Sequence, residues 1–388
     1  MFRWLEKMQK RLQIPQQTLI VWSILLGIAL FAPLLSHNKP IVCRSEEGWS
    51  FPIFDRLDHI HEGQCRVLLR PLLPFHPSEL DTRIRNPAPP GTRSADGRMH
   101  YLGTDEYGRD VAAGLIYGTR LSVSIALLSM GIAALLGMVI GIPAGRFQYS
   151  NPRMPLLSLA LGGLLVLYGG WVLYWHGGWL KWSAILSLVG GLGIVGYFMY
   201  KMLLRVFPKF RTVTVVLPVD EMMRWTLEWI SALPGIFVLL VVLSKILPPG
   251  IFTVSILIGL LNFPHKANII RTEVERLHRQ PFVRNAILMG LSPLQLAVRY
   301  YLPILFPILG ISVLSGMAMA IVLESTLSFL GMGLATETMT WGSMLGSTRK
   351  YFDAWWLGVF PGVLIYLSVY SLYAWSERLQ RRQRLAYH

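Results

Sequence analysis

Residues 300–323 read YYLPILFPILGISVLSGMAMAIVL and contain no charged side chain. The hydrocarbon core of a bilayer is about 30 Å thick, so about 20 consecutive apolar residues suffice for one helical crossing. This run is long enough for that, and it predicts a transmembrane helix. It also sets the pattern with which the rest of the chain can be compared.

The same pattern recurs along the 388 residues, of which 53% are hydrophobic and 15% charged, against roughly 25% charged in soluble proteins. Charge-free runs occur at 18–35, 121–145, 154–180, 182–200, 229–244, 246–264, 300–323 and 354–376. Only Lys245 and a Pro-Pro-Gly turn separate the fifth run from the sixth, so one bent element is an alternative there. Two spans are favoured, because the combined run is too long for one crossing. We expect an all-α polytopic bundle of about eight transmembrane helices.

Lysine and arginine in short loops predict the orientation, since such loops resist translocation. A cytoplasmic N-terminus places most cations on the inner side: Arg3, Lys7, Lys10, Arg11, Arg146, Arg153, Lys201, Arg205, Lys209, Arg211, Arg224, Lys266, Arg271, Arg276, Arg279, Arg284, Arg299, Arg378, Arg381, Arg382 and Arg384. The short outer loops carry only Lys181, Lys245, Arg349 and Lys350. Both termini are therefore predicted to be cytoplasmic. The net charge of +15 then faces anionic lipid and partner proteins rather than nucleic acid.

The first run follows a basic segment, as a signal peptide would. The run is long, however, and no A-x-A cleavage pattern follows it before His37, so we expect a retained signal anchor. A long extracytoplasmic segment, about residues 36–117, comes next and holds the only two cysteines, Cys43 and Cys65. In an oxidising compartment they could form a disulfide, and two free thiols are an equal alternative. His59, His61 and Glu62 also cluster here, but without a further spaced ligand group a metal site is disfavoured.

A short polar motif precedes the second span. Residues 102–110 read LGTDEYGRD, and Gly118-Thr119-Arg120 stands at the expected start of the helix. Glycines permit tight turns, and Asp and Arg side chains can cap or pair within a turn. We expect an ordered turn at the membrane surface, called here the outer turn, built on Gly103, Thr104, Asp105, Gly108, Arg109 and Asp110.

The longest loop on the inner side, residues 266–302, is called here the inner loop. Apolar side chains recur in it at helical spacing, namely Phe282, Val283, Ala286, Leu288 and Met289. Gly290 and Ser292-Pro293 then interrupt the helix, and a second amphipathic piece leads to Arg299. We expect a short helix on the cytoplasmic surface that another protein can approach closely. Surface helices are common in membrane proteins, so this feature alone assigns no function.

A third motif begins at Glu324 and reads ESTLSFLGMG, followed by WGSML at 341–345 and by WWL at 355–357. Tryptophans at the ends of spans commonly anchor in the interface, and we expect these to do so. Glu324 lies near the end of its span, where it could have a structural role or line a pathway.

Together these segments resemble the second permease of the dipeptide and oligopeptide class of ABC importers. The outer turn before a span that begins with TR, the Gly290 loop ending in R-x-x-L-P at 299–303, and ESTLSFLGMG followed by WG-x-ML match that family in order and spacing. The resemblance covers residues 1–150 and about 213–388. The segments KPIV at 39–42 and GWSFP at 48–52 resemble the Yej-type branch, which has an enlarged outer segment.

The resemblance implies that the loop around Gly290 is the coupling helix, which docks in a groove of a cytoplasmic ATPase. The matching positions are Ala286, Gly290 and the flanking Leu288, Met289 and Leu291, and the coupling loop also includes Arg284 and Asn285. The family usually has Glu-Ala-Ala where this chain has Arg284-Asn285-Ala286. Either the ATPase surface differs locally, or the acidic contact is dispensable. A non-functional permease is disfavoured, because the other motifs are intact.

The resemblance also divides the chain. It implies a cytoplasmic N-terminus and first helix at 1–35, the extracytoplasmic segment at 36–117, the second helix at 118–150 and the rest of the six-helix permease core at 213–388. Residues 151–212 are an inserted helix pair. Its Gly-Gly pairs could favour close packing of helices, but a peripheral accessory facing lipid is the favoured interpretation.

No G-x-x-x-x-G-K-[ST] sequence is present, so ATP hydrolysis is expected from partner subunits, and we expect neither catalytic residues nor a bound cofactor. The implied mechanism is alternating access in a bacterial inner membrane. The expected partners are a second homologous permease, two cytoplasmic ATPases and an extracytoplasmic solute-binding protein. Peptides are the expected substrate, with nickel, opines and sugars as alternatives within the class. A carrier acting alone and a membrane enzyme are disfavoured, because mid-membrane ionisable groups and a converging catalytic set are not evident.

Overall fold

The structure, a computed structural model, describes residues 16–45, 48–50, 66–81, 87–94, 96–147, 153–155, 214–216, 219–245, 248–334 and 338–386. The chain forms two compact units, one made of Met1–Ile142 and Leu227–His388 and the other of Pro143–Thr226. Of the predicted inserted helix pair at 151–212, the structure describes only strand β6, Arg153–Pro155. This strand pairs with β7, Thr214–Val216.

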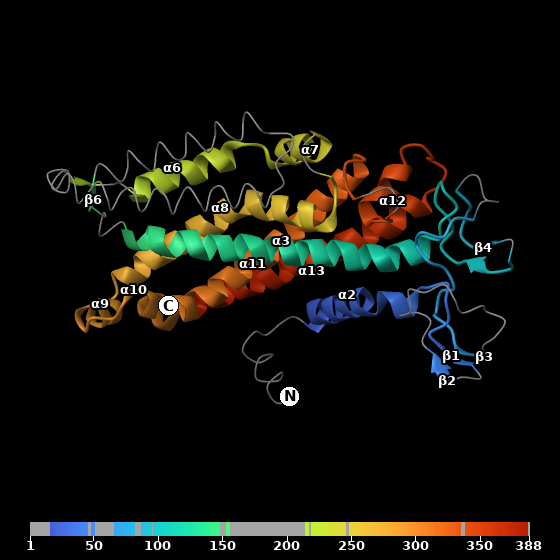
Figure 1. The fold of residues 1–388 in the computed structure, drawn as a ribbon, viewed down its shortest axis with the longest axis horizontal. Helices are drawn as coiled ribbons and strands as arrows, with labels where there is room; N and C mark the ends of the chain where they lie inside the picture. The colour runs from blue at the N-terminus through green and yellow to red at the C-terminus, as the bar shows by residue number, and fades with distance from the viewer. Residues whose placement is uncertain are drawn as a thin grey trace, which may run out of the picture. The chain divides into compact units, whose positions relative to one another are not determined.

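The larger unit is mainly helical (Figure 1). Its helices are α2, Gln16–Leu35; α7, Gly235–Lys245; α8, Ile251–His278; α9, Pro281–Leu288; α10, Pro293–Leu296; a π-helical turn, Ala297–Tyr301; α11, Leu302–Phe329; α12, Trp341–Ser347; and α13, Trp356–Ala386. Two more helices, α3, Val111–Phe147, and α6, Val219–Ala232, run across the boundary between the units.

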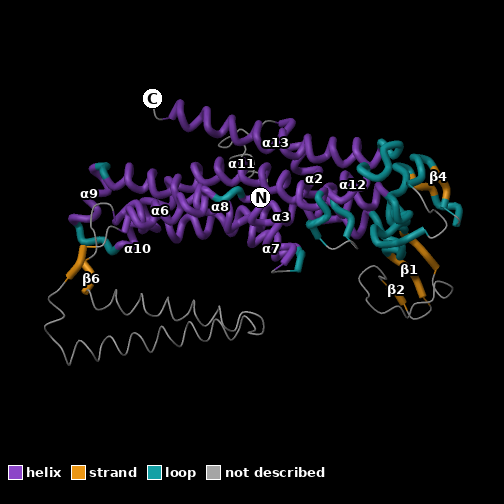
Figure 2. Tube along the Cα trace, turned by 90° about the horizontal axis from the view of Figure 1, so that it is seen from above, coloured by secondary structure: helices purple, strands orange, loops and turns teal. Residues whose placement is uncertain are grey.

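The described part of the segment between α2 and α3 contains five short strands. Strand β1, Val42–Ser45, pairs antiparallel with both β2, Gly48–Ser50, and β3, Arg66–Leu69. Strands β4, Thr92–Arg93, and β5, Met99–His100, form a small hairpin. This segment and α12 lie at one end of the long helices, whereas α9 and α10 lie at the other (Figures 1 and 2).

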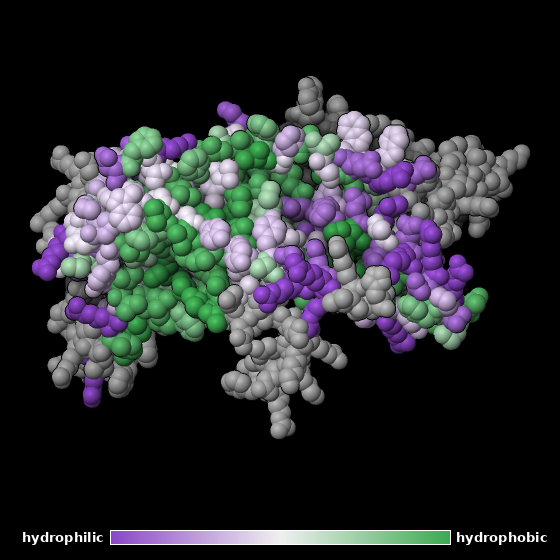
Figure 3. Space-filling model, turned by 180° about the vertical axis from the view of Figure 1, so that it is seen from behind, coloured by the Kyte–Doolittle hydropathy of each residue, from purple (hydrophilic) through white to green (hydrophobic). Residues whose placement is uncertain are grey.

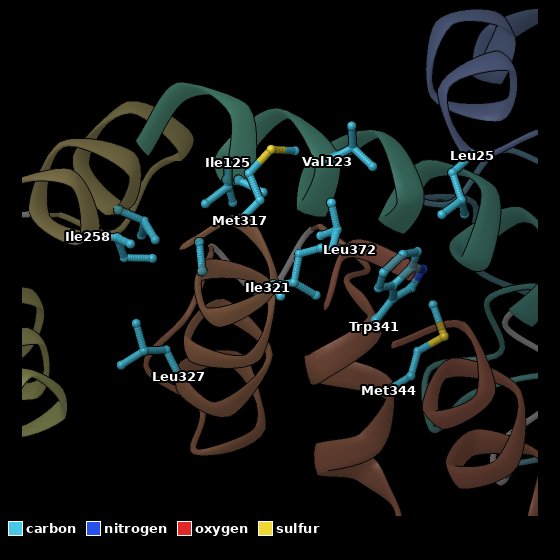
Figure 4. Close-up of a cluster of buried hydrophobic side chains, with 14 of the residues drawn as sticks. Leu25, Val123, Ile125, Ile258, Met317, Ile321, Leu327, Trp341, Met344 and Leu372 are labelled. Atoms are coloured by element: carbon cyan, nitrogen blue, oxygen red, sulfur yellow. The ribbon is translucent and has the colours of Figure 1, made fainter. Parts of the chain in front are cut away.

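The core of the larger unit forms around α11, which is apolar on all sides and packs against α8, α12 and α13. A helix with no polar face is one that is surrounded by other helices or by lipid. Ile321 and Met317 of α11 meet Ile125 of α3, Ile258 of α8 and Leu372 of α13 in one buried cluster (Figure 4).

Three described helices are long and apolar enough to cross a membrane: Val111–Arg146, Pro293–Phe329 and Trp356–Gln383. A fourth candidate is the pair Glu221–Ala232 and Gly235–Lys245, and α2 contributes a shorter apolar helix, Ile20–Leu35. On one face of the molecule apolar side chains form a broad area flanked by hydrophilic ones (Figure 3). The prediction of a helical, multi-span membrane protein is confirmed, while the number of eight spans stays a prediction.

The predicted span at 229–244 is not one continuous helix. Helix α6 ends at Ala232, α7 begins at Gly235, and the two are bent by 74°. Pro234 stands at the break. It lacks a backbone N–H and disfavours helical backbone at Leu233, so a continuous helix is interrupted there.

The predicted start of the second span at residue 118 is also wrong. Helix α3 begins seven residues earlier, at Val111, and Gly118-Thr119-Arg120 lies inside it. The cause is local: the side chain of Asp110 caps the helix by accepting the N–H of Ala113 at 2.7 Å. The charge-free pattern located the apolar part of the helix but not its capped beginning.

Lys266 was predicted to lie in the inner loop, and the structure corrects this. Helix α8 continues to His278, so Lys266 lies within it and is only 2% exposed. Its ammonium group donates to the backbone carbonyl oxygen of Ser312 in α11 at 2.7 Å. The aliphatic part of the Lys266 side chain packs between helices, and the Ser312 carbonyl oxygen accepts a hydrogen bond from the ammonium group. A hydropathy pattern does not indicate such an acceptor.

Candidate functional site

The outer turn is closed by its own side chains, as predicted. Asp105 accepts the backbone N–H groups of Tyr107 and Arg109 through Oδ1 at 2.9 and 2.8 Å, and its Oδ2 accepts from the Arg109 guanidinium at 2.7 Å. Gly103 and Gly108 have φ angles of +82° and +78°, which L-residues rarely adopt. Residues 103–105 and 108–110 are all buried, so the turn is a packed element rather than a loose loop.

Asp110 links this turn to the small hairpin as well as to α3. While Oδ1 caps the helix, Oδ2 contacts Nδ1 of His100 at 2.9 Å, and both side chains are almost fully buried. The His100 ring stacks on Phe75 at 4.3 Å between centroids. The start of α3 is therefore held by one carboxylate that serves two partners.

Nearby, His76 is half-buried in the outer segment and makes an edge contact with Tyr117 of α3, with 5.4 Å between ring centroids. Burial lowers the pKa of His76 below its usual value, which favours the neutral imidazole. The packing of this segment against α3 therefore does not depend on a charged histidine.

The outer turn contacts Trp356 and Lys350, each more than 240 positions away in the chain. The indole N–H of Trp356 donates to the carbonyl oxygen of Thr104 at 3.1 Å. The ammonium group of Lys350 lies 3.1 Å from Oε2 of Glu106. These contacts fix the turn against the start of α13, and no spacing in the sequence indicated them.

The third motif itself packs on the first turns of α3. Trp341 is fully buried and donates from its indole N–H to the carbonyl oxygen of Leu115 at 3.2 Å. A β-carbon at Gly118 would lie 2.8 Å from its ring, so only glycine fits beneath it. The expectation that Trp341 and Trp356 anchor in the interface is wrong, because both are core residues, whereas Trp355 is exposed.

Gly342, next to Trp341, brings α12 into contact with α11. A β-carbon at this position would overlap the carbonyl oxygen of Ser325 and lie 2.7 Å from the Ser325 Cα. The glycine is therefore required by the approach of two backbones, which explains the Trp-Gly pair of the motif.

Glu324 is buried where α3 and α11 meet, with 1% of its surface exposed. The hydroxyl of Ser122 donates to its Oε2 and the hydroxyl of Ser328 donates to its Oε1, each at 2.9 Å. Both carboxylate oxygens thus have a hydroxyl partner, one from α3 and one from the next turn of α11 itself. Glu324 was expected to have a structural role or to line a pathway. The two hydroxyl contacts are structural, and a role in the pathway stays a prediction.

At the opposite end, the inner loop is a compact helical hairpin. Val283 of α9 is buried among Val274, Leu277 and Tyr301 in a separate apolar cluster. His278 contacts the Tyr301 hydroxyl at 3.0 Å, and Ser292 forms a capping box with Gln295 at the start of α10. The loop therefore has a fixed shape of its own.

Gly290 interrupts the helix where predicted. With φ of +80° it follows the C-cap of α9, where its N–H bonds to the carbonyl oxygen of Ile287 and the next N–H, of Leu291, bonds to that of Ala286. This is a Schellman motif, in which a left-handed residue ends a helix. The chain reverses there and exposes the residues just before it.

The predicted docking residues divide into two faces. Ala286 is fully buried, and Leu291 is half-buried against the apolar cluster. Arg284, Asn285, Leu288, Met289 and Gly290 are exposed. Leu288 is 84% and Met289 70% exposed, and Leu294 of α10, which was not predicted, is 73% exposed. Of the predicted residues, Ala286 is corrected to a packing residue, because it faces the interior of the loop.

Other predicted features lie outside the described residues. Cys65 belongs to them, so the structure does not test a disulfide with Cys43, and His59, His61 and Glu62 belong to them too. Within the described ranges, no group of three or more metal-binding side chains is arranged to hold an ion.

Comparison with known proteins connects the chain to one family. Residues 216–384 match the binding-protein-dependent transport system inner membrane component. A di/tripeptide transport system permease of Pseudomonas aeruginosa is 26% identical over 317 residues, which are 81% of this chain and 82% of that protein. The chain is a permease subunit of a binding-protein-dependent ABC transporter. It is thus a multi-pass membrane protein and not an enzyme.

Further relatives of the permease come from Brucella suis. One named for peptide transport is 26% identical over 277 residues, covering 71% of this chain and 70% of its own length. Another, named as a peptide permease, is 27% identical over 312 residues, which are 79% of this chain and 78% of that protein. The matched family region includes α7 to α12 and most of α13, and so holds the inner loop, Glu324 and Trp341. Permeases of this family work with ATPase and binding-protein partners.

Proposed function

We propose that this permease forms half of the transmembrane pathway of an ABC importer for peptides. One structural observation carries the proposal: a compact helical hairpin exposes Leu288, Met289 and Leu294 at the end of the long helices opposite the outer turn. Large apolar side chains seldom cluster on a protein surface that faces water, and such a cluster is typical of a protein-binding site. The choice of peptides as the substrate comes from the names of the relatives, which are described as peptide permeases.

In this proposal the inner loop docks on one of two cytoplasmic ATPases. A second homologous permease supplies the other half of the pathway, and an extracytoplasmic solute-binding protein delivers peptides to the outer side. Both termini then lie in the cytoplasm, the segment between α2 and α3 lies outside, and the inserted pair at 151–212 brings the number of spans to eight. ATP-driven closure of the ATPases moves the inner loop and switches the pathway between its two openings.

The first test is purification of the full-length permease from its native membrane in mild detergent. We expect ATPase subunits and a second permease to be recovered with it, and ATP hydrolysis to rise when binding protein and a di- or oligopeptide are added. Recovery of the chain alone would contradict the proposal. Stimulation by nickel, an opine or a sugar, but not by peptides, would keep the importer and change its substrate.

A second test concerns Glu324. A carrier acting alone would need an ionisable group in its spans, whereas hydroxyl groups bond both oxygens of this carboxylate. We expect Glu324→Gln to keep peptide uptake within about twofold of the original, since an amide can retain both hydroxyl contacts. Glu324→Leu, the control, removes both acceptors and should lower the free energy of unfolding by about 1–3 kcal/mol. Loss of uptake in a stably folded Glu324→Gln protein would favour the carrier.

A further inference from the structure

The tip of the inner loop is positively charged as well as apolar. From residue 280 to residue 302 the chain contains Arg284 and Arg299 and no acidic residue. Neither arginine side chain forms a hydrogen bond or ion pair within the described part of the chain, and both residues are exposed. The neighbouring arginines differ in this respect: Arg276 pairs with Glu273 and Arg279 pairs with Glu275.

Arg284 stands on the same side of α9 as the exposed apolar residues. It precedes Leu288 by four positions, which on a helix places the two side chains next to each other. Val283 and Ala286, which face inward, hold this face outward. The tip thus presents one surface with an apolar centre and an unpaired guanidinium at its edge.

This surface lies beyond the hydrocarbon of the membrane. Helix α8 has 28 residues and is about 42 Å long, which exceeds a hydrocarbon core of about 30 Å. Its last turns carry four charged side chains, which lipid would not tolerate: Arg271, Glu273, Glu275 and Arg276. Because α9 follows these residues, Leu288 and Arg284 face the aqueous phase and the proteins in it.

We propose that the ATPase partner presents an acidic side chain that pairs with Arg284, beside an apolar pocket that receives Leu288 and Met289. The proposal rests on the proposed function, since it describes the partner of the same loop. A like-charged partner surface would be repelled, and an uncharged one would leave a guanidinium desolvated without a partner. Arg284 is therefore a specificity determinant, which selects an ATPase with a carboxylate at that place.

The experiment measures binding of the copurified ATPase to the full-length permease in detergent and in nanodiscs. We expect Arg284→Glu to weaken binding about tenfold or more, Arg284→Lys to stay close to the original, and salt to weaken the original but not the Glu variant. Arg381→Glu is the matched control, because it makes the same charge change at an exposed site in α13. Replacing acidic residues of the ATPase one at a time by Arg should yield one change that restores binding to Arg284→Glu.

Each outcome has a distinct meaning. If the original permease binds no ATPase, the proposed function fails. If it binds and Arg284→Glu binds equally well, only the acidic partner is refuted. An effect of Arg284→Glu that appears in nanodiscs containing phosphatidylglycerol, but not in detergent or in phosphatidylcholine alone, would assign Arg284 to anionic lipid instead and overturn the proposal. The thermal unfolding temperature of each variant excludes misfolding as the cause.

Discussion

Replacing Gly342 by alanine is expected to disrupt the junction of α11 and α12. The added β-carbon would overlap the carbonyl oxygen of Ser325 and approach its Cα to 2.7 Å, and backbone cannot rotate away as a side chain can. Overpacking of a core typically costs about 1–3 kcal/mol, and a clash with backbone belongs at or above the upper end of that range. The measurement is thermal unfolding of the purified permease in detergent, together with the amount of folded protein recovered.

Gly310→Ala is the matched control for this experiment. Gly310 also lies in α11, but a β-carbon there would meet nothing within 4 Å. Since alanine favours a helix over glycine by about 1 kcal/mol, this variant should be as stable as the original or slightly more so. Equal unfolding temperatures of the two variants would refute the role given to Gly342.

The second large effect is expected from Asp110→Ala. This change removes the cap of α3 and leaves Nδ1 of the buried His100 without its partner. Loss of a cap costs about 1 kcal/mol, and a buried polar group without a partner costs about 1–3 kcal/mol more. We expect the free energy of unfolding to fall by about 2–4 kcal/mol and exchange of the α3 N-terminal amides to accelerate.

Asp96→Ala serves as the control, because it removes the same charge from an exposed surface pair with Arg98 in the same outer segment. Surface pairs contribute at most about 1 kcal/mol. Asp110→Asn, which keeps an acceptor for the Ala113 N–H, should be intermediate. If Asp110→Ala and Asp96→Ala unfold alike, the carboxylate does not hold the start of α3.

Within the described residues, hydropathy predicted the helical class and most helix cores correctly, because a helix surrounded by lipid needs a long apolar run however it packs. It failed where a helix boundary depends on individual hydrogen bonds or on a proline. Asp110 begins α3 before the apolar run, and Pro234 breaks a run that looks continuous. The closure of the outer turn by Asp105 and Arg109 was predictable, since both residues belong to the same short segment.

Contacts between distant segments were beyond prediction. The motifs around Thr104 and Trp341 were recognised separately, but nothing in a single sequence indicates that Trp356 bonds to Thr104 or that Trp341 packs on Gly118. The inward orientation of Ala286 depends on how α9 packs over α8. Apolar spacing leaves this orientation open, because α9 has apolar side chains on its outer face as well as on its inner one.

The buried bond from Lys266 to the carbonyl oxygen of Ser312 affects how motion can pass through the molecule. It ties α8 to α11, the two helices that carry the inner loop between them. Where water is scarce, breaking such a bond leaves both groups unsatisfied, so the helices resist sliding past each other. A push on Leu288 should therefore turn α8 and α11 together as one rigid body. Beside this bond, Gly137 and Gly141 of α3 let Lys266 and Ile270 of α8 approach closely.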